Sequence, residues 1–222
     1  LVLGDGQSEK VFRVCRAWYG RFSLSLAYAE RVSEASSTAQ TQVPPAWELA
    51  LLSLRQASVP PRVSIHEVPA PVKIAPYAVA ISAETALHVE AEAPATGRFV
   101  CLYDPQTQEG WGGEFRVIAL VATDTELALG EDPLAGEVAW SWLRECLASR
   151  DADYGHLVGT ATTTINRSFE GFALRATSAT LEIRASWTPG SPDLSAHFLA
   201  WLDTMLQATG LSPEENVTQL RH

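Results

Sequence analysis

The sequence predicts an α+β domain in which helices pack on one antiparallel sheet of about six to seven strands. Three observations lead to this fold class. Hydrophobic residues make up 46% of the 222-residue chain and charged residues 19%, as in a globular protein. Several segments alternate apolar and polar residues, which is typical of strands with one buried face. Two later segments begin with a capping residue followed by proline, and we expect these two helices and one short earlier helix to cover the sheet.

The first 43 residues form a candidate extension to this domain. Val11, Cys15, Trp18 and Phe22 recur about one helical turn apart within residues 8–30, which predicts a helix. This helix has a basic, aromatic character, which leaves open a membrane-surface or targeting role. The alternative is a poorly ordered extension, and we favour it because disorder concentrates at chain ends. We assign residues 44–214 to a single α+β domain and residues 215–222 to a tail.

A short helix is predicted from Pro44-Pro45 through Ala57, and extended chain follows it. The apolar residues of the helix fall on one stripe, formed by Trp47, Ala50, Leu51 and Leu54. Pro60 and Pro61 end the helix. Residues 62–82 then read as extended, with alternating apolar positions at Val63, Ile65, Tyr77, Val79 and Ile81.

Three further strand regions are predicted. Residues 97–122 form a hairpin, with a turn-forming loop that begins at Asp104-Pro105 and ends at Gly112-Gly113. Residues 157–165 and 169–176 suggest a strand pair that turns around Ser168. The strand 180–187 has the clearest alternation, because Leu181, Ile183, Ala185 and Trp187 face one way while Glu182, Arg184 and Ser186 face the other.

Two helices carry clear start signals. Asp132-Pro133 opens the first helix, and Leu134, Val138, Trp142 and Cys146 recur every four residues along it. Ser191-Pro192 opens the second, whose expected buried stripe is Leu194, Phe198, Trp201, Met205 and Leu206. Each helix follows a strand, and Trp142-Leu143 matches Trp201-Leu202 at the same offset. These matches suggest two pseudo-repeated strand–helix halves.

Several motifs in this order resemble an actinobacterial protein family of unknown function (DUF 3000). The resemblance covers about residues 45–213. It rests on Glu67-Val68-Pro69-Ala70-Pro71, Ala75-Pro76-Tyr77, Gly97-Arg98-Phe99, Leu102-Tyr103-Asp104-Pro105, Trp111-Gly112-Gly113, Trp140-Ser141-Trp142-Leu143, Glu182 through Pro189, and Gly210-Leu211-Ser212-Pro213. Membership implies an actinobacterial cytoplasmic protein. It supplies no activity, cofactor or catalytic residue.

Charge and cysteine content limit the classes of partner and chemistry. The net charge is −10, and an acidic surface repels nucleic-acid phosphates and anionic lipid. The sequence contains no run of about 18 apolar residues, the length that a membrane-spanning helix needs. The cysteines Cys15, Cys101 and Cys146 lack the spacing of a zinc site or a disulfide framework. No phosphate loop, HExxH or GxSxG motif occurs. We therefore expect no cofactor and no metal, assign no catalytic residue, and place the protein in the cytoplasm.

Two sets of residues are candidate binding positions. Trp111 is a large apolar side chain beside three glycines in the loop that Asp104 opens, where it serves either as an anchor for a partner or as a cover for the sheet. Arg98, Arg116, Glu182 and Arg184 occupy polar positions of predicted strands. If these strands are neighbours, the arginines form either a carboxylate- or phosphate-binding site or ordinary cross-strand ion pairs.

The function remains unknown at this stage, and whether the protein is an enzyme stays open. The leading hypothesis is a non-enzymatic cytoplasmic binding or regulatory protein that recognises a protein partner. The alternative is an enzyme or small-ligand binder that recognises a carboxylate- or phosphate-bearing molecule through the sheet arginines.

Overall fold

The computed structural model describes residues 43–86 and 94–211. The chain divides into two units, Leu1–Val43 and Pro44–His222, and every element below belongs to the second. The predictions for residues 8–30 and for the tail 215–222 lie outside the described residues. No helix in the described ranges is both long enough and apolar enough to cross a membrane.

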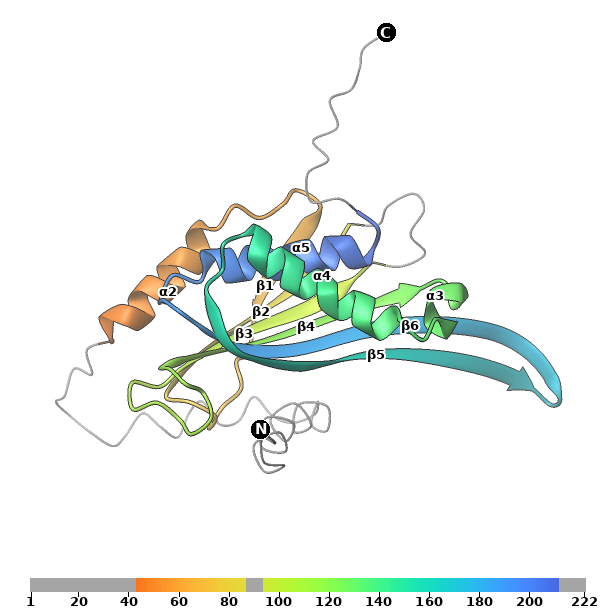
Figure 1. Ribbon diagram of the computed structural model, residues 1–222, viewed down its shortest axis with the longest axis horizontal. Helices are drawn as coiled ribbons and strands as arrows, with labels where there is room; N and C mark the ends of the chain where they lie inside the picture. Colours follow the sequence, from red (N-terminus) through yellow and green to blue (C-terminus); the bar gives the residue numbers. More distant parts are fainter. Residues whose placement is uncertain (1–42, 87–93, 212–222) are drawn as a thin grey trace, which may run out of the picture. The chain divides into compact units, whose positions relative to one another are not determined.

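The second unit is an α+β domain with one six-stranded antiparallel sheet, as predicted (Figure 1). The strand order is β1-β2-β3-β4-β6-β5, so only the pairing of β4 with β6 joins strands that do not follow one another among the described elements. The elements in chain order are α2 (Pro45–Gln56), β1 (Val63–Val68), β2 (Tyr77–Thr85), β3 (Thr96–Tyr103), β4 (Phe115–Thr125), α3 (Leu127–Glu131), α4 (Ala135–Ser149), β5 (Tyr154–Glu170), β6 (Ala173–Pro189) and α5 (Ser195–Ala208).

The helices cover one face of the sheet, which we call the helix face (Figure 1). The register places Phe99 of β3 beside Ala119 of β4, and Ala119 beside Ala185 of β6, so these three side chains share that face. The strand alternation read from the sequence is therefore confirmed. We call the opposite side of the sheet the second face.

The centre of the core is a group of aromatic side chains around Phe99, which is fully buried. Its ring lies 5.4 Å from Phe198, 5.5 Å from Trp201 and 6.5 Å from Trp187, between ring centroids. The Trp201 indole donates a hydrogen bond to the Leu120 backbone oxygen at 2.9 Å. These contacts bind α5 to β3, β4 and β6 through large apolar areas.

Gly97 makes this close approach of α5 to the sheet possible. A Cβ atom at position 97 would lie 2.7 Å from Cζ2 of Trp201 and 2.9 Å from the Leu120 oxygen. Contacts this short are repulsive, so only glycine allows the indole to lie against the strands here.

Three details of the predicted elements are wrong. The strands expected at 169–176 and 180–187 are one strand, β6, and the hairpin turns at Gly171-Phe172 instead of Ser168. The positive φ of Gly171, 59°, fits the two-residue turn, which favours glycine at its first position. α5 begins at Ser195, after Leu194, and not directly after Ser191-Pro192; Asp193 Oδ1 accepts the backbone N–H of Ser195 at 2.9 Å.

The buried stripe of α4 also differs from the predicted one. Leu134 precedes the helix and is 56% exposed, and Val138 is 41% exposed. Residues four apart drift by about 40° per step around an α-helix, so a strict four-residue repeat leaves the buried side. Only Cys146 of the predicted set is buried, and the observed stripe is Ala135, Ala139, Leu143, Cys146 and Leu147. The similarity of the two strand–helix halves stays a prediction.

A buried serine joins α2 and α5, the first and last helices among the described residues of this unit. The Ser53 hydroxyl in α2 donates to the Ala50 backbone oxygen at 2.8 Å and accepts the backbone N–H of Leu194 at 2.9 Å. Leu194 is the residue before α5, so this bond satisfies one of the N–H groups that a helix start leaves without an intrahelical partner.

Replacing Ser53 by alanine is expected to lower the free energy of unfolding by about 1–3 kcal/mol, because the Leu194 N–H stays buried after its acceptor is removed. Urea denaturation followed by tryptophan fluorescence measures the change. Ser64→Ala is the matched control, because the Ser64 hydroxyl bonds to a backbone oxygen at an exposed position. Equal effects of the two substitutions would contradict this account of Ser53.

Candidate functional site

The predicted arginines lie on the second face of the sheet. Arg98 of β3 and Arg184 of β6 flank Leu120 of β4 in one cross-strand row. Glu182 shares this face one row away, beside Ala122. Arg116 lies on the same face two rows in the other direction, about 13 Å along the strand from Leu120. The strands are neighbours as expected, and the register brings together Arg98, Arg184 and Glu182 but not Arg116.

The partners of these arginines are groups of the chain itself. Arg184 Nε lies 2.6 Å from Glu182 Oε1, an ion pair between half-buried side chains. Arg116 is buried and donates to the His156 backbone oxygen at 3.1 Å and to Thr188 Oγ1 at 3.0 Å. Arg184 therefore forms an ion pair within its own strand β6 instead of the cross-strand ion pair expected from the sequence, and Arg116 holds the start of β5 against β6.

The loop between β3 and β4 is folded against the sheet. Trp111 is 9% exposed, and its backbone oxygen accepts a hydrogen bond from Thr188 Oγ1. Asp104 accepts the Gln106 backbone N–H at 3.0 Å and the Gln108 side-chain amide at 3.1 Å. Of the two interpretations of Trp111, the buried arrangement describes this structure, and Asp104 acts as a turn former.

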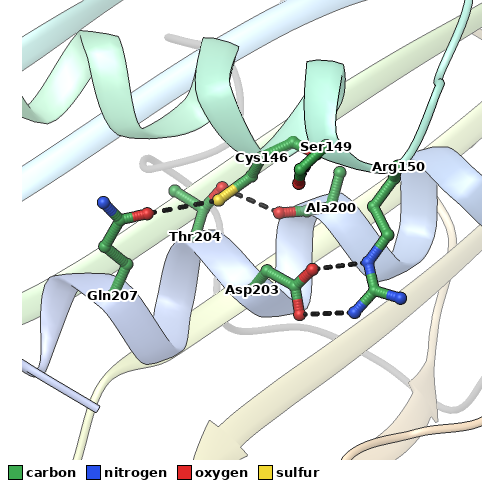
Figure 2. Close-up of polar contacts among 7 residues, drawn as sticks. All are labelled: Cys146, Ser149, Arg150, Ala200, Asp203, Thr204 and Gln207. Atoms are coloured by element: carbon green, nitrogen blue, oxygen red, sulfur yellow. Dashed lines mark hydrogen bonds and ion pairs between the residues drawn. The ribbon is translucent and has the colours of Figure 1, made fainter. Parts of the chain in front are cut away.

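Polar and sulfur groups also gather between α4 and α5 (Figure 2). Arg150 donates two hydrogen bonds to the buried Asp203 carboxylate, from Nε to Oδ2 at 2.6 Å and from Nη2 to Oδ1 at 3.0 Å. Cys146 Sγ lies 3.4 Å from Gln207 Oε1. Both contacts connect the end of α4 to α5, so we interpret them as contacts that hold these two helices together.

The thiols of the described residues are poorly suited to nucleophilic chemistry. Burial raises the pKa of the Cys146 thiol, and complete burial raises the pKa of the Cys101 thiol far above its ordinary value. The thiolate is the reactive form, and a raised pKa makes it scarce at neutral pH. Within the described ranges, no group of three or more His, Cys, Asp or Glu side chains is arranged to hold a metal ion.

The hairpin of β5 and β6 continues beyond the other strands (Figure 1), a feature that the predicted strand pair did not include. The pairing of β4 with β6 ends at Thr125 and Ala179, whereas β5 and β6 pair with each other as far as Glu170 and Ala173. We call residues 166–178 the hairpin extension. A hairpin of only two strands has little stability of its own in water.

The hairpin extension carries apolar side chains in the open. Every residue from 166 to 176 is exposed. Phe172 in the turn is fully exposed, and the cross-strand pair Phe169 and Leu174 is 62% and 54% exposed. Large apolar side chains grouped on a surface mark sites of interaction.

Two ion pairs involve residues of the extension. Arg175 pairs with Glu170 across the hairpin, and Arg167 Nη2 lies 3.4 Å from Glu131 Oε1 of α3. All four side chains are more than half exposed, so each pair contributes little stability. The extension is therefore held in place mainly by its backbone ladder.

A signal for this hairpin exists in the sequence. Gly171 stands between Phe169 and Leu174, and glycine at the first position of a two-residue loop favours a tight hairpin. The polar run Asn166-Arg167-Ser168 masks this signal because it looks like a loop. The extension is exposed because β4 ends at Thr125 and does not continue beside it. The sequence near residues 166–178 does not determine where β4 ends.

A family model described as a protein of unknown function, DUF3000, matches residues 43–218. No curated protein and no solved structure matches the chain.

Proposed function

The chain belongs to the DUF3000 family of proteins of unknown function, and we propose that it is a non-enzymatic binding or regulatory protein that contacts a protein partner through its hairpin extension. The observation that carries this proposal is the exposed apolar tip formed by Phe169, Phe172 and Leu174. We also propose a cytoplasmic location, as the resemblance of the sequence implies.

The energetics favour a protein partner with an apolar pocket. Burying one phenylalanine side chain contributes about 1.5–3 kcal/mol, and aromatic side chains are prominent among residues that dominate binding energy. Phe172 projects from a two-residue turn at the end of two paired strands, a shape that fits into a concave surface. Arg167, Glu170 and Arg175 surround this tip and supply a polar rim, as in protein interfaces.

The alternative of a small anionic ligand on the second face has less support. Arg184 is already paired with Glu182, and Arg116 is buried in bonds to neutral groups about 13 Å further along the sheet. An anion would have to replace an existing carboxylate contact to bind Arg184.

A photoreactive phenylalanine analogue at position 172 is expected to crosslink one partner protein in cells. The control is the same analogue at Val72, which is 80% exposed but lies outside the hairpin. For the purified partner, Phe172→Ser is expected to raise the Kd about tenfold to a hundredfold, because the phenylalanine loses its pocket. Equal crosslinking at 172 and 72, or an unchanged Kd, would refute the proposal.

A further inference from the structure

The two edges of the sheet differ in a way that points to a second binding surface. β1, at one edge, has six residues, stands between Pro60-Pro61 and Pro69, and contains Glu67. β5, at the other edge, has 17 residues and no proline. Short length, proline and charge are devices that prevent an edge strand from pairing with another chain. β1 has these devices; β5 has a register shift of the bulge type between Gly155 and Val158, and its segment 158–166 has none of them.

The central part of β5 is well suited to pairing. From Leu157 to Asn166 it contains no charged residue, and Val158, Thr160, Thr162, Thr163, Thr164 and Ile165 are β-branched. Such side chains favour the extended conformation and pack well across strands. Within the described residues β5 pairs on one side only, with β6, and every second residue of an edge strand directs its N–H and C=O groups outward.

We propose that two copies of this chain associate through β5, which pairs antiparallel with β5 of the second copy about a two-fold axis at Thr162. Thr162 is the midpoint of the regular segment 158–166, so this register gives complete overlap of that segment in the two copies. The two sheets then form one continuous sheet across the interface. The proposal concerns the backbone edge of β5 and is independent of the proposed partner contact at the hairpin tip.

The sequence of β5 is complementary to itself in this register. Thr162 meets its own copy, Thr160 meets Thr164, and Gly159 meets Ile165. Val158 meets Asn166, and the segment 158–166 contains no charged residue, so no charge meets a like charge there. Pairs of threonines across antiparallel strands are favourable, whereas directly opposed like charges are not. This complementarity favours a second copy over an unrelated strand as the partner.

Association would also place a third strand at the base of the hairpin extension, which has only two strands in the single chain. In the single chain the extension has two strands and is exposed at every position from 166 to 176. In the paired arrangement, Asn166 at the base of the extension pairs with Val158 of the second copy, so a third strand reaches the point where the extension begins. Three strands are much more stable than two, because each backbone ladder adds to the others.

Sedimentation equilibrium of the full chain at several concentrations tests this proposal. We expect the wild-type chain to form dimers and Thr162→Lys to weaken dimerisation about tenfold or more, because two lysines then oppose each other at the axis. Thr162 is exposed and faces Glu182 on its own β6, so a lysine is tolerated in the single chain. His66→Lys on the β1 edge is the control and should leave the dimer unchanged. A wild-type monomer, or a Thr162→Lys dimer as tight as wild type, would overturn the proposal.

Cysteine substitutions test the register in a chain whose Cys15 is replaced by serine. Thr162→Cys is expected to form a disulfide between the two copies, because each cysteine faces its own copy. Thr164→Cys is the control, since its copy lies four residues along the paired strand, about 13 Å away and beyond disulfide reach. Equal disulfide formation at both positions, or none at 162, would overturn the axis at Thr162. Phe172→Ser should retain the dimer, which separates this proposal from the one on the hairpin tip.

Discussion

Replacing Phe99 by alanine is expected to lower the free energy of unfolding by about 3–5 kcal/mol. Phe99 is fully buried and contacts Trp187, Phe198 and Trp201, which come from β6 and α5. Alanine would leave a cavity between the sheet and α5, and this rigid aromatic group cannot collapse to fill it. The loss is comparable to the whole stability of a marginal domain, so part of the variant is expected to be unfolded at room temperature.

Chemical denaturation measures this effect, and Phe172→Ala is the matched control. Phe172 is the same residue type but is fully exposed, so its removal should change the free energy of unfolding by less than about 0.5 kcal/mol. The two substitutions together test the distinction between a phenylalanine that stabilises the fold and one available for binding. A large loss of stability in Phe172→Ala would contradict the exposed position of the tip.

Stability is expected to fall between about pH 6.5 and pH 4 because of His197. This side chain is buried, and its Nδ1 accepts the indole N–H of Trp187 at 3.1 Å. Burial lowers the pKa of His197 to about 4, although Asp153 and Asp193 oppose the shift. The unfolded histidine has a pKa near 6.5, so below that pH the unfolded chain binds a proton that the folded chain excludes. The stabilisation is complete above pH 6.5 and decreases as the pH falls, by about 3 kcal/mol in total.

Urea denaturation at pH 7.5, 6, 5 and 4 tests this pH dependence against His197→Gln. Glutamine cannot titrate, and its side-chain oxygen can accept the Trp187 N–H. The variant is therefore expected to show a flatter dependence on pH than the wild-type chain over the same interval. Curves of identical slope for the two proteins would show that His197 is not responsible.

Much of the fold follows from local patterns in the sequence. The alternation in residues 180–187 places Trp187 on the helix face because side chains alternate across a strand whatever its neighbours are. The stripe of α2 and the buried stripe of α5 follow in the same way from helical periodicity. The error in α4 has a physical origin, since Leu134 and Val138 fit a repeat of four but not the true period of the helix.

The surface features depend on contacts between distant parts of the chain. Arg184 pairs with Glu182 two residues away, but its place beside Leu120 depends on the crossover that brings β6 next to β4. Trp111 looks exposed in a glycine-rich loop, yet its burial depends on contact with Thr188, which is 77 residues away. The apolar tip at Phe172 is recognisable only once the end of β4 is known. The sequence next to each of these residues therefore does not predict where its side chain lies.

The packing of Phe99 against the last helix has a consequence for synthesis on the ribosome. The first four strands can pair as soon as they emerge, because each pairs with its neighbour in sequence. Phe198 and Trp201, which cover Phe99, are made about a hundred residues after it, so the nascent meander leaves Phe99 without these two contacts until α5 emerges. A chain released before α5 is complete would keep Phe99 without its α5 contacts and become a substrate for chaperones or proteases.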